Sequence, residues 1–273
     1  MNRPASAPLA LLFLGCADPG SVTTTPTAAR HQADPASIEV MTYNLNYGLA
    51  GDRETLLAIA SEDPDVVFLQ ETTDAWESEL VRELGGRYPH KAFRHCCGAG
   101  GLGVLSKFPI EEREYLDPPD GGWFPAWRFI VHAPIGTFQA LAVHLRPQLS
   151  ESGSFLGGVF VTPPIRLAEI ETYFPKLDPA LPTLVAGDFN ENGRGRAIRF
   201  LEDRGMVSAL PAASGSAPTW RWNTSLGEIR EQLDHLVFDQ RLVVTNVRVI
   251  ERGNSDHLPV VATVQAAPSP LTK

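Results

Sequence analysis

The chain has 273 residues, 43% of them hydrophobic and 20% charged, which is the composition of a globular protein with a large buried core. This length suits one large domain or two small ones. The formal net charge of -9 argues against a protein that binds polyanions through a broad basic surface. The sequence contains no GxSxG, P-loop or HExxH motif, which excludes the usual serine hydrolases, NTPases and zincins.

The N-terminal segment has the layout of a bacterial export signal. Arg3 precedes a short apolar run, APLALLFLG, and Cys16 follows it. A Cys after Leu-Phe-Leu-Gly resembles a lipoprotein cleavage box, which predicts a signal peptide over 1–16 with Cys16 as the lipidated first residue. The alternative is a plain secretory signal with an incidental Cys. We expect a disordered linker over 17–36, and a monomer that is exported, either as a membrane-anchored envelope lipoprotein or as a secreted protein.

The first part of the chain after the linker alternates strand and helix patterns. Period-two alternation predicts strands, and apolar residues at helical spacing predict helices. In the second helix, Asp74 and Glu77 are placed as a capping box, and Gly85 follows as a stop signal. We expect strands over 38–48 and 65–71 and helices over 52–63 and about 74–84.

The second part of the chain is richer in strands. Apolar segments from about 100 to 145, separated by Pro and Gly, predict hairpins. We then expect a helix in 163–176, a strand over 183–188, a helix near 194–204, and final strands over 232–238, 242–250 and 258–265. No repeat and no internal linker appears, so the pattern predicts one domain over 37–267, followed by a loose tail over 268–273.

The two remaining cysteines, Cys96 and Cys97, are adjacent. Neighbouring cysteines bridge only in a strained ring, so we predict two packed thiols at the base of a loop. No CxxC pair is present, which argues against a structural zinc site. The following glycines form a GxGxxG, but this run leads into a strand signal that carries Pro109, which predicts a flexible loop and not a dinucleotide site.

Polar side chains recur where the predicted strands begin or end. The residues are Asn44, Glu71, His144, Asp188, Asn190, Asp234, Asp256 and His257. Any one of them could be a turn residue or a hydrogen-bonded core histidine. Because buried carboxylates and imidazoles must be paired or bound to something, their recurrence points to one shared site. Carboxylate and amide oxygens gathered at one sheet edge would suit Mg²⁺ or Mn²⁺.

The ordered motifs MTYNLN, LQE, SKFPI, VHL, GDFN, LDHLVF and SDHLPV closely resemble the endonuclease/exonuclease/phosphatase superfamily. The resemblance covers nearly the whole chain after the linker. It implies an α+β fold, a four-layer αββα sandwich of two mixed β-sheets flanked by helices. It also implies a divalent-metal-dependent phosphoester hydrolase, most of all a phosphodiesterase in which a metal-activated water attacks in line with the help of a His–Asp pair.

The resemblance implies a metal site for Mg²⁺, or Mn²⁺, built from three residues. Glu71 would be the principal ligand, and Asn44 beside it would hold the metal or the phosphate. Asp256 would be a second ligand. A divalent ion neutralises phosphate charge and lowers the pKa of a coordinated water, which is what phosphoryl transfer needs most.

The resemblance also implies catalytic roles. Asp188 would orient or deprotonate the attacking water, and Asn190 would hold a phosphate oxygen. His257 would contact the scissile phosphate, with Asp234 fixing its tautomer. His144 would be the acid for the leaving oxygen, since an imidazole titrates near neutral pH.

The substrate is a phosphate ester of unspecified class: a lipid headgroup, a small diester or a nucleic acid. Loops over 118–127 and 150–164 carry aromatic residues that either fill gaps in the sandwich or form an apolar rim beside the phosphate site. Membrane association through Cys16 would favour a lipid-linked substrate. Two alternatives stay open, a secreted endonuclease and a non-catalytic lipoprotein that retains the fold.

Overall fold

The computed structural model describes residues 36–151, 153–210, 217–225 and 227–268. The predicted signal peptide over 1–16 and nearly all of the predicted linker and tail lie outside these residues, so the lipidation of Cys16 stays a prediction. Within the described residues, no helix combines the length and apolar character needed to cross a membrane.

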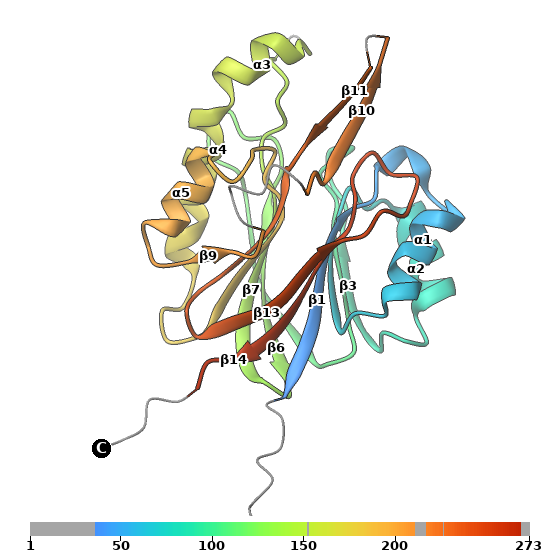
Figure 1. The fold of residues 1–273 in the computed structure, drawn as a ribbon, viewed down its shortest axis with the longest axis vertical. Coiled ribbons are helices and arrows are strands. Elements are labelled where there is room, and N and C mark those ends of the chain that lie inside the picture. The colour runs from blue at the N-terminus through green and yellow to red at the C-terminus, as the bar shows by residue number, and fades with distance from the viewer. Residues whose placement is uncertain (1–35, 152, 211–216, 226, 269–273) are drawn as a thin grey trace, which may run out of the picture. The chain divides into compact units, whose positions relative to one another are not determined.

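Two six-stranded sheets form the centre of the fold (Figure 1). The strands of the first are β1 Ser37–Asn44, β2 Val66–Gln70, β3 His90–Arg94, β4 Leu102–Ser106, β13 Leu242–Val249 and β14 Val260–Ala266. Those of the second are β5 Ile110–Leu116, β6 Ala126–Ala133, β7 Gly136–His144, β8 Thr183–Asp188, β9 Val207–Ser208 and β12 Asp234–Phe238. Their orders are β13-β14-β1-β2-β4-β3 and β5-β6-β7-β8-β12-β9. Both sheets are mixed, because β1 runs parallel to β2, and β7 to β8, among antiparallel pairs.

Helices cover the outer faces of the two sheets (Figure 1). The helices α1 Arg53–Glu62 and α2 Asp74–Leu84 lie on the first sheet, and α4 Pro163–Tyr173 and α5 Arg196–Glu202 on the second. The helix α3 Phe155–Val161 and the hairpin of β10 Trp220–Thr224 and β11 Gly227–Glu231 project at one end of the sandwich. Short 3₁₀ helices occupy Tyr47–Leu49 and Phe174–Lys176.

Three clusters of buried apolar side chains define four layers. Successive side chains of a strand point to opposite faces, so β1 sends Val40 into the core between the sheets and Met41 towards α1 and α2. In β8, Ala186 likewise faces the other sheet and Val185 faces α4 and α5. The predicted αββα sandwich is therefore confirmed.

Local details differ from the sequence-based expectations. The first strand ends at Asn44, and Tyr47 begins a 3₁₀ turn. The helix α2 is capped by the side chain of Thr73, which accepts from the N–H of Trp76, so the predicted capping box is wrong. Thr73 is one residue before the predicted cap, and its hydroxyl meets the same need. The segment 150–164 also contains α3, which the loop interpretation missed.

Cys96 and Cys97 form a disulfide, so the prediction of two packed thiols is wrong. Cys97 and Gly98 both have positive φ values, of 43° and 68°. This left-handed turn, for which glycine is favoured, lets the chain reverse so that the neighbouring sulfur atoms meet. The GxGxxG run does form a loop that leads into β4, as predicted.

The buried imidazole of His235 in β12 should make stability depend on pH. Burial lowers its pKa from 6.5 to about 4, although its Nε2 lies 2.9 Å from the carbonyl oxygen of Glu191. Below its ordinary pKa the unfolded chain binds a proton that the folded chain refuses, so the stabilisation present above pH 6.5 is lost as pH falls towards 4. Between pH 7 and pH 5, this effect amounts to about 2 kcal/mol of unfolding free energy.

Urea denaturation of wild type and His235→Asn at both pH values measures this difference. Wild type should lose about 2 kcal/mol more than the variant over this interval. Because the two slopes are compared, any loss of packing in the variant cancels. Equal slopes would contradict a neutral buried His235.

Candidate active site

The predicted site residues lie at the end of the sandwich where α3 and the β10–β11 hairpin project (Figure 1). Asn44, His144 and Asp188 are the last residues of β1, β7 and β8. Asp188 lies opposite His144 in the parallel pair and opposite Asp234, the first residue of β12, in the antiparallel pair. Parallel strands end at the same edge, and an antiparallel neighbour begins there, so residues far apart in sequence meet.

Period-two alternation aims these side chains into the space between the sheets. Asn44 follows Val40 at an even spacing along β1, and Asp188 follows Ala186 along β8, and both apolar residues belong to the inter-sheet core. His144 and Asp234 hold the same relation to Ala142 and Leu236. The site is therefore a continuation of the inter-sheet core in which polar side chains replace apolar ones.

Asp188 is the centre of the site. Its Oδ2 lies 3.5 Å from Nε2 of His144 and 3.5 Å from Nε2 of His257. Asn44 donates to the same oxygen at 3.2 Å, and the backbone N–H of Asn190 donates to Oδ1 at 2.8 Å. Burial raises the pKa of Asp188 to about 6, against the lowering effect of His257. A carboxylate with this pKa is ionised near neutral pH and is a stronger base than an exposed one.

His257 and Asp234 form the predicted pair. Nδ1 of His257 lies 2.9 Å from Oδ2 of Asp234, and both side chains are buried. Burial lowers the pKa of His257, but the carboxylates of Asp234 and Asp188 outweigh it and raise the pKa to about 10. The hydroxyl of Thr219 accepts from the N–H of Asp234, which fixes this end of β12. His257 is therefore held as an imidazolium whose Nε2 points at Asp188.

Glu71 and Asn44 form the predicted metal-binding side of the site. Asn44 donates to Oε1 of Glu71 at 3.0 Å, and the N–H of Tyr47 donates to Oε2 at 3.0 Å. Glu71 has a φ of 59°, a left-handed conformation that is costly for a residue with a side chain. Burial raises the pKa of Glu71. Asp256 lines the same cleft, but its oxygens accept from Asn46 and Trp220, each at 3.0 Å.

The donor set fits a divalent cation. Three carboxylates, Glu71, Asp188 and Asp256, line the cleft, and among the described residues that line it there is no Lys or Arg. An anionic phosphate could enter only with a cation that offsets this charge. Hard carboxylate and amide oxygens are the ligands that Mg²⁺ and Mn²⁺ take. Asp188, Asp234 and His257 also have metal-ligand spacing, but the hydrogen bond between the last two accounts for their proximity.

The cleft has a volume of about 400 Å³ and a wall that is largely apolar. Its apolar lining is Pro147, Leu149, Trp220, Trp222 and Leu233. The indoles of Trp220 and Trp222 come from β10, with ring centroids 6.1 Å apart. Sequence reasoning missed these two residues. The alternating WRW before a Gly turn is the hairpin signal that would have located them.

The two aromatic loops differ in their relation to the cleft. In 118–127, Trp127 is buried between the sheets and Phe124 packs behind His144, with ring centroids 4.4 Å apart. The gap-filling interpretation is therefore confirmed for these two residues. In 150–164, Gly153 lines the cleft, whereas Phe160 in α3 is 81% exposed.

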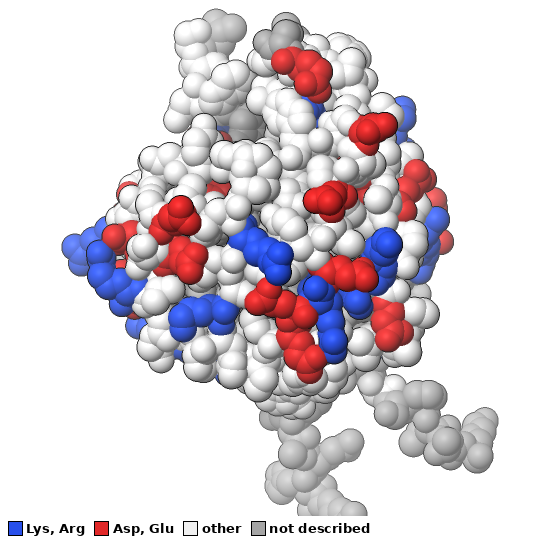
Figure 2. Space-filling view, turned by 180° about the vertical axis from the view of Figure 1, so that it is seen from behind, with Lys and Arg blue, Asp and Glu red and all other residues white. Residues whose placement is uncertain are grey.

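Surface charge is mixed in sign. Figure 2 shows Lys and Arg side chains interspersed with Asp and Glu on the face opposite to the view in Figure 1. Several pair with one another, as Arg248 does with Glu39 and Glu62. This face offers no continuous basic surface to a polyanion.

A sequence model of the endonuclease/exonuclease/phosphatase family matches residues 41–257, which include every predicted site residue. The chain belongs to this family. Members of the endonuclease/exonuclease/phosphatase family hydrolyse phosphoester bonds and use divalent metals. Among curated protein sequences, none matches this chain.

Solved structures of the endonuclease/exonuclease/phosphatase fold superpose on this chain. A protein from Beutenbergia cavernae is 21% identical with a TM-score of 0.66, over 86% of this chain and 73% of that one. The human nocturnin catalytic domain with bound sulfate is 20% identical with a TM-score of 0.61, over 85% and 94%. TDP2 of D. rerio with a single-stranded DNA product is 16% identical with a TM-score of 0.63, over 85% and 100%. At these identities, the likeness concerns the fold.

Proposed function

We propose that this chain is a divalent-metal-dependent phosphodiesterase. The observation that carries the proposal is the position of Asp188, whose buried carboxylate lies between the imidazoles of His144 and His257 and beside Asn44. Such a group has a base at its centre and a proton donor on either side. Hydrolysis of a diester requires both functions, at the attacking water and at the leaving oxygen.

Each residue of the chain has a distinct part in the proposed reaction. Asp188 orients the attacking water and accepts its proton. The His257 imidazolium donates a hydrogen bond to a phosphate oxygen, and Asp234 holds the ring in that orientation. His144 gives a proton to the leaving oxygen through Nε2. A divalent cation held by Glu71 and Asn44, with Asp256 nearby, would supply charge neutralisation at the phosphate.

The cleft favours a small or lipid-linked diester over a polymer. Its wall is apolar and its described lining contains no Lys or Arg, so it offers no track for a charged backbone. An alkyl, aryl or acyl group beside the phosphate would lie against Trp220 and Trp222. The size of about 400 Å³ suits a headgroup and not an extended strand.

Hydrolysis of bis(p-nitrophenyl) phosphate and of p-nitrophenyl phosphate, each with Mg²⁺, Mn²⁺ or EDTA, tests the proposal. We expect metal-dependent turnover of the diester that EDTA abolishes. The aryl groups match the apolar wall, so kcat/KM should be larger for the diester than for the monoester. Faster turnover of the monoester would replace the diesterase by a phosphatase, and equal activity with EDTA would overturn the metal requirement.

Nuclease activity is the second candidate, and the two indoles of the cleft favour it. Aromatic side chains that lie side by side can stack bases of a single strand, each worth about 1–3 kcal/mol. TDP2 of D. rerio, which shares the fold, has been solved with a single-stranded DNA product. Nicking of a supercoiled plasmid distinguishes this candidate, which requires cleavage that Trp222→Ala weakens.

A further inference from the structure

The loop between β3 and β4 carries the disulfide and is anchored at both ends to the start of α2. At its N-terminal end, Nδ1 of His95 lies 3.2 Å from Oγ1 of Thr72, and Nε2 lies 2.8 Å from Oε2 of Glu77. At its C-terminal end, the carbonyl of Gly101 accepts from the N–H of Thr72 at 3.1 Å. The ends of the loop are therefore fixed relative to the residue that follows Glu71.

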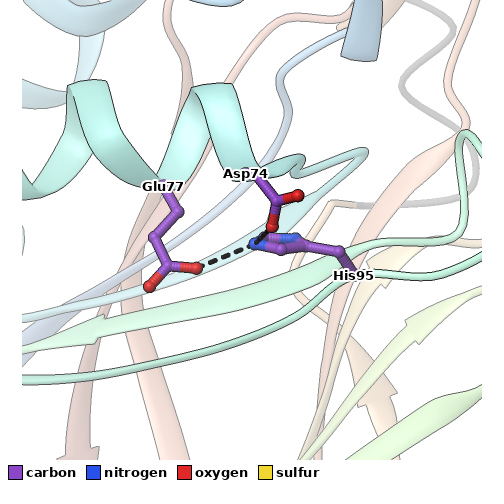
Figure 3. A group of neighbouring side chains, drawn as sticks. All are labelled: Asp74, Glu77 and His95. Atoms are coloured by element: carbon purple, nitrogen blue, oxygen red, sulfur yellow. Dashed lines mark hydrogen bonds and ion pairs between the residues drawn. The ribbon is translucent and has the colours of Figure 1, made fainter.

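The cluster of His95, Glu77 and Asp74 has the spacing of metal ligands (Figure 3). Both ring nitrogens of His95 already have hydrogen-bond partners in the protein, and Asp74 is fully exposed. We therefore assign this cluster to anchoring of the loop. It leaves the segment from Cys96 to Gly100 as the part whose conformation the anchors do not set.

The middle of the loop contacts His144 in two ways. The carbonyl oxygen of Ala99 lies 3.2 Å from Nδ1 of His144, and the ring of Phe124 stacks on its imidazole. Gly100 is packed between the disulfide and Phe124, because a Cβ there would lie 2.8 Å from Sγ of Cys96 and 2.8 Å from Cδ1 of Phe124. The disulfide thus packs through Gly100 against the ring that supports His144.

We propose that the Cys96–Cys97 disulfide is a positioning element for His144, an inference that rests on the proposed function. A carbonyl oxygen can only accept, so contact with Ala99 places a proton on Nδ1 of His144. That leaves Nε2, 3.5 Å from Asp188, as the nitrogen that takes up and releases a proton in the cleft. The disulfide keeps the Ala99 carbonyl in this position.

The covalent bond is needed because the segment is rich in glycine. Gly98, Gly100 and Gly101 leave the backbone many accessible conformations, each of which aims the Ala99 carbonyl differently. Holding one residue in one conformation costs about 1–2 kcal/mol of entropy, which the disulfide meets at the time of folding. Without it, His144 would lose its fixed acceptor and would populate the Nε2–H tautomer as well.

Reduction by a dithiol removes this constraint reversibly. A thiolate of the dithiol attacks one sulfur, the bond between the Cys96 and Cys97 sulfurs breaks, and the released thiolate takes a proton. The second thiol then displaces the first cysteine, so two electrons pass to the protein and the dithiol leaves as its own disulfide. Cys16 is the only other cysteine of the chain, so Cys16→Ser makes the pair the only reducible group.

The experiment compares the full chain carrying Cys16→Ser in its oxidised form, after dithiothreitol, and with Cys96→Ser and Cys97→Ser added. With ¹⁵N-labelled histidine, NMR gives the tautomer of His144, assigned by the loss of its signals in His144→Asn. We expect Nδ1–H in the oxidised protein and a tautomer mixture in the other two. For bis(p-nitrophenyl) phosphate, kcat should fall roughly 10- to 100-fold with KM little changed. Dithiothreitol should have no effect on the serine variant.

An unchanged His144 tautomer in the reduced protein would overturn the proposal, whether or not kcat falls. A lower kcat with the same tautomer would show that the disulfide supports the cleft in another way. If the oxidised protein hydrolyses no diester, the proposed function fails, while the NMR comparison still decides whether the disulfide positions His144.

Discussion

The substitution Asp188→Asn is expected to lower kcat for the diester by roughly 10²- to 10⁴-fold, with little change in KM. Asn has the shape of Asp, so the backbone N–H of Asn190 can still be accepted at the position of Oδ1. An amide cannot take a proton from water at neutral pH, however, and the base of the reaction is lost. Its pKa of about 6, which burial raises, makes Asp188 the described carboxylate best suited to this step.

Steady-state kinetics and thermal melting of the purified variant check this prediction together. Asp203→Asn is the matched control, because Asp203 is an exposed carboxylate at the end of α5, and it should keep wild-type kinetics. A folded Asp188→Asn protein with a kcat within tenfold of wild type would exclude Asp188 as the base. The proposal would then have to place that function on another group of the cleft.

The substitution Asp234→Asn should also lower kcat by roughly 10²- to 10⁴-fold, but for a different reason. Asp234 touches no substrate in the proposed reaction; it holds Nδ1 of His257 at 2.9 Å. An amide that donates to Nδ1 would select the other tautomer. The pKa of His257, which is about 10 because two carboxylates outweigh the burial of the ring, should fall. NMR titration of His257 measures this fall independently of activity.

Stability separates this effect from a general loss of structure. Oδ1 of Asp234 has no hydrogen-bond partner among the described residues, and the carboxylate of Asp188 lies on the neighbouring strand. Removing one of two nearby buried negative charges should therefore leave the melting temperature unchanged or raise it. A variant that melts much earlier than wild type would assign Asp234 a structural role, and a variant with normal kcat would exclude the pair from catalysis.

Most of the site could be predicted from the sequence because strands alternate with a period of two. Residues that stand at even spacings from buried apolar positions share their face, so Asn44, His144, Asp188 and Asp234 had to follow the inter-sheet core. The motifs at the strand ends then required no long-range information beyond the order of the strands. The resemblance carried by GDFN and SDHLPV supplied the second sheet and its packing, which alternation alone does not specify.

Other features depend on contacts between segments far apart in the chain. Trp220 reaches the cleft because β10 pairs only with β11 and projects beyond the sheets, and its indole is placed by Asp256. Asp256 was predicted as a ligand, but tertiary structure decided that its oxygens accept from Trp220 and Asn46. No local pattern encodes such a contact, since the partners lie more than thirty residues apart.

The cysteine pair shows the same division most clearly. The sequence determined that Cys96 and Cys97 lie in a glycine-rich loop before a strand, and chemical reasoning about neighbouring cysteines favoured free thiols. The left-handed backbone at Cys97 and the packing of Gly100 against Phe124 decided otherwise. By itself, therefore, the sequence determined which residues end each strand and which face they share, because those follow from local geometry. Only the tertiary structure decided the disulfide, the walls of the cleft and the partners of each polar atom, because those are set by distant segments packing together.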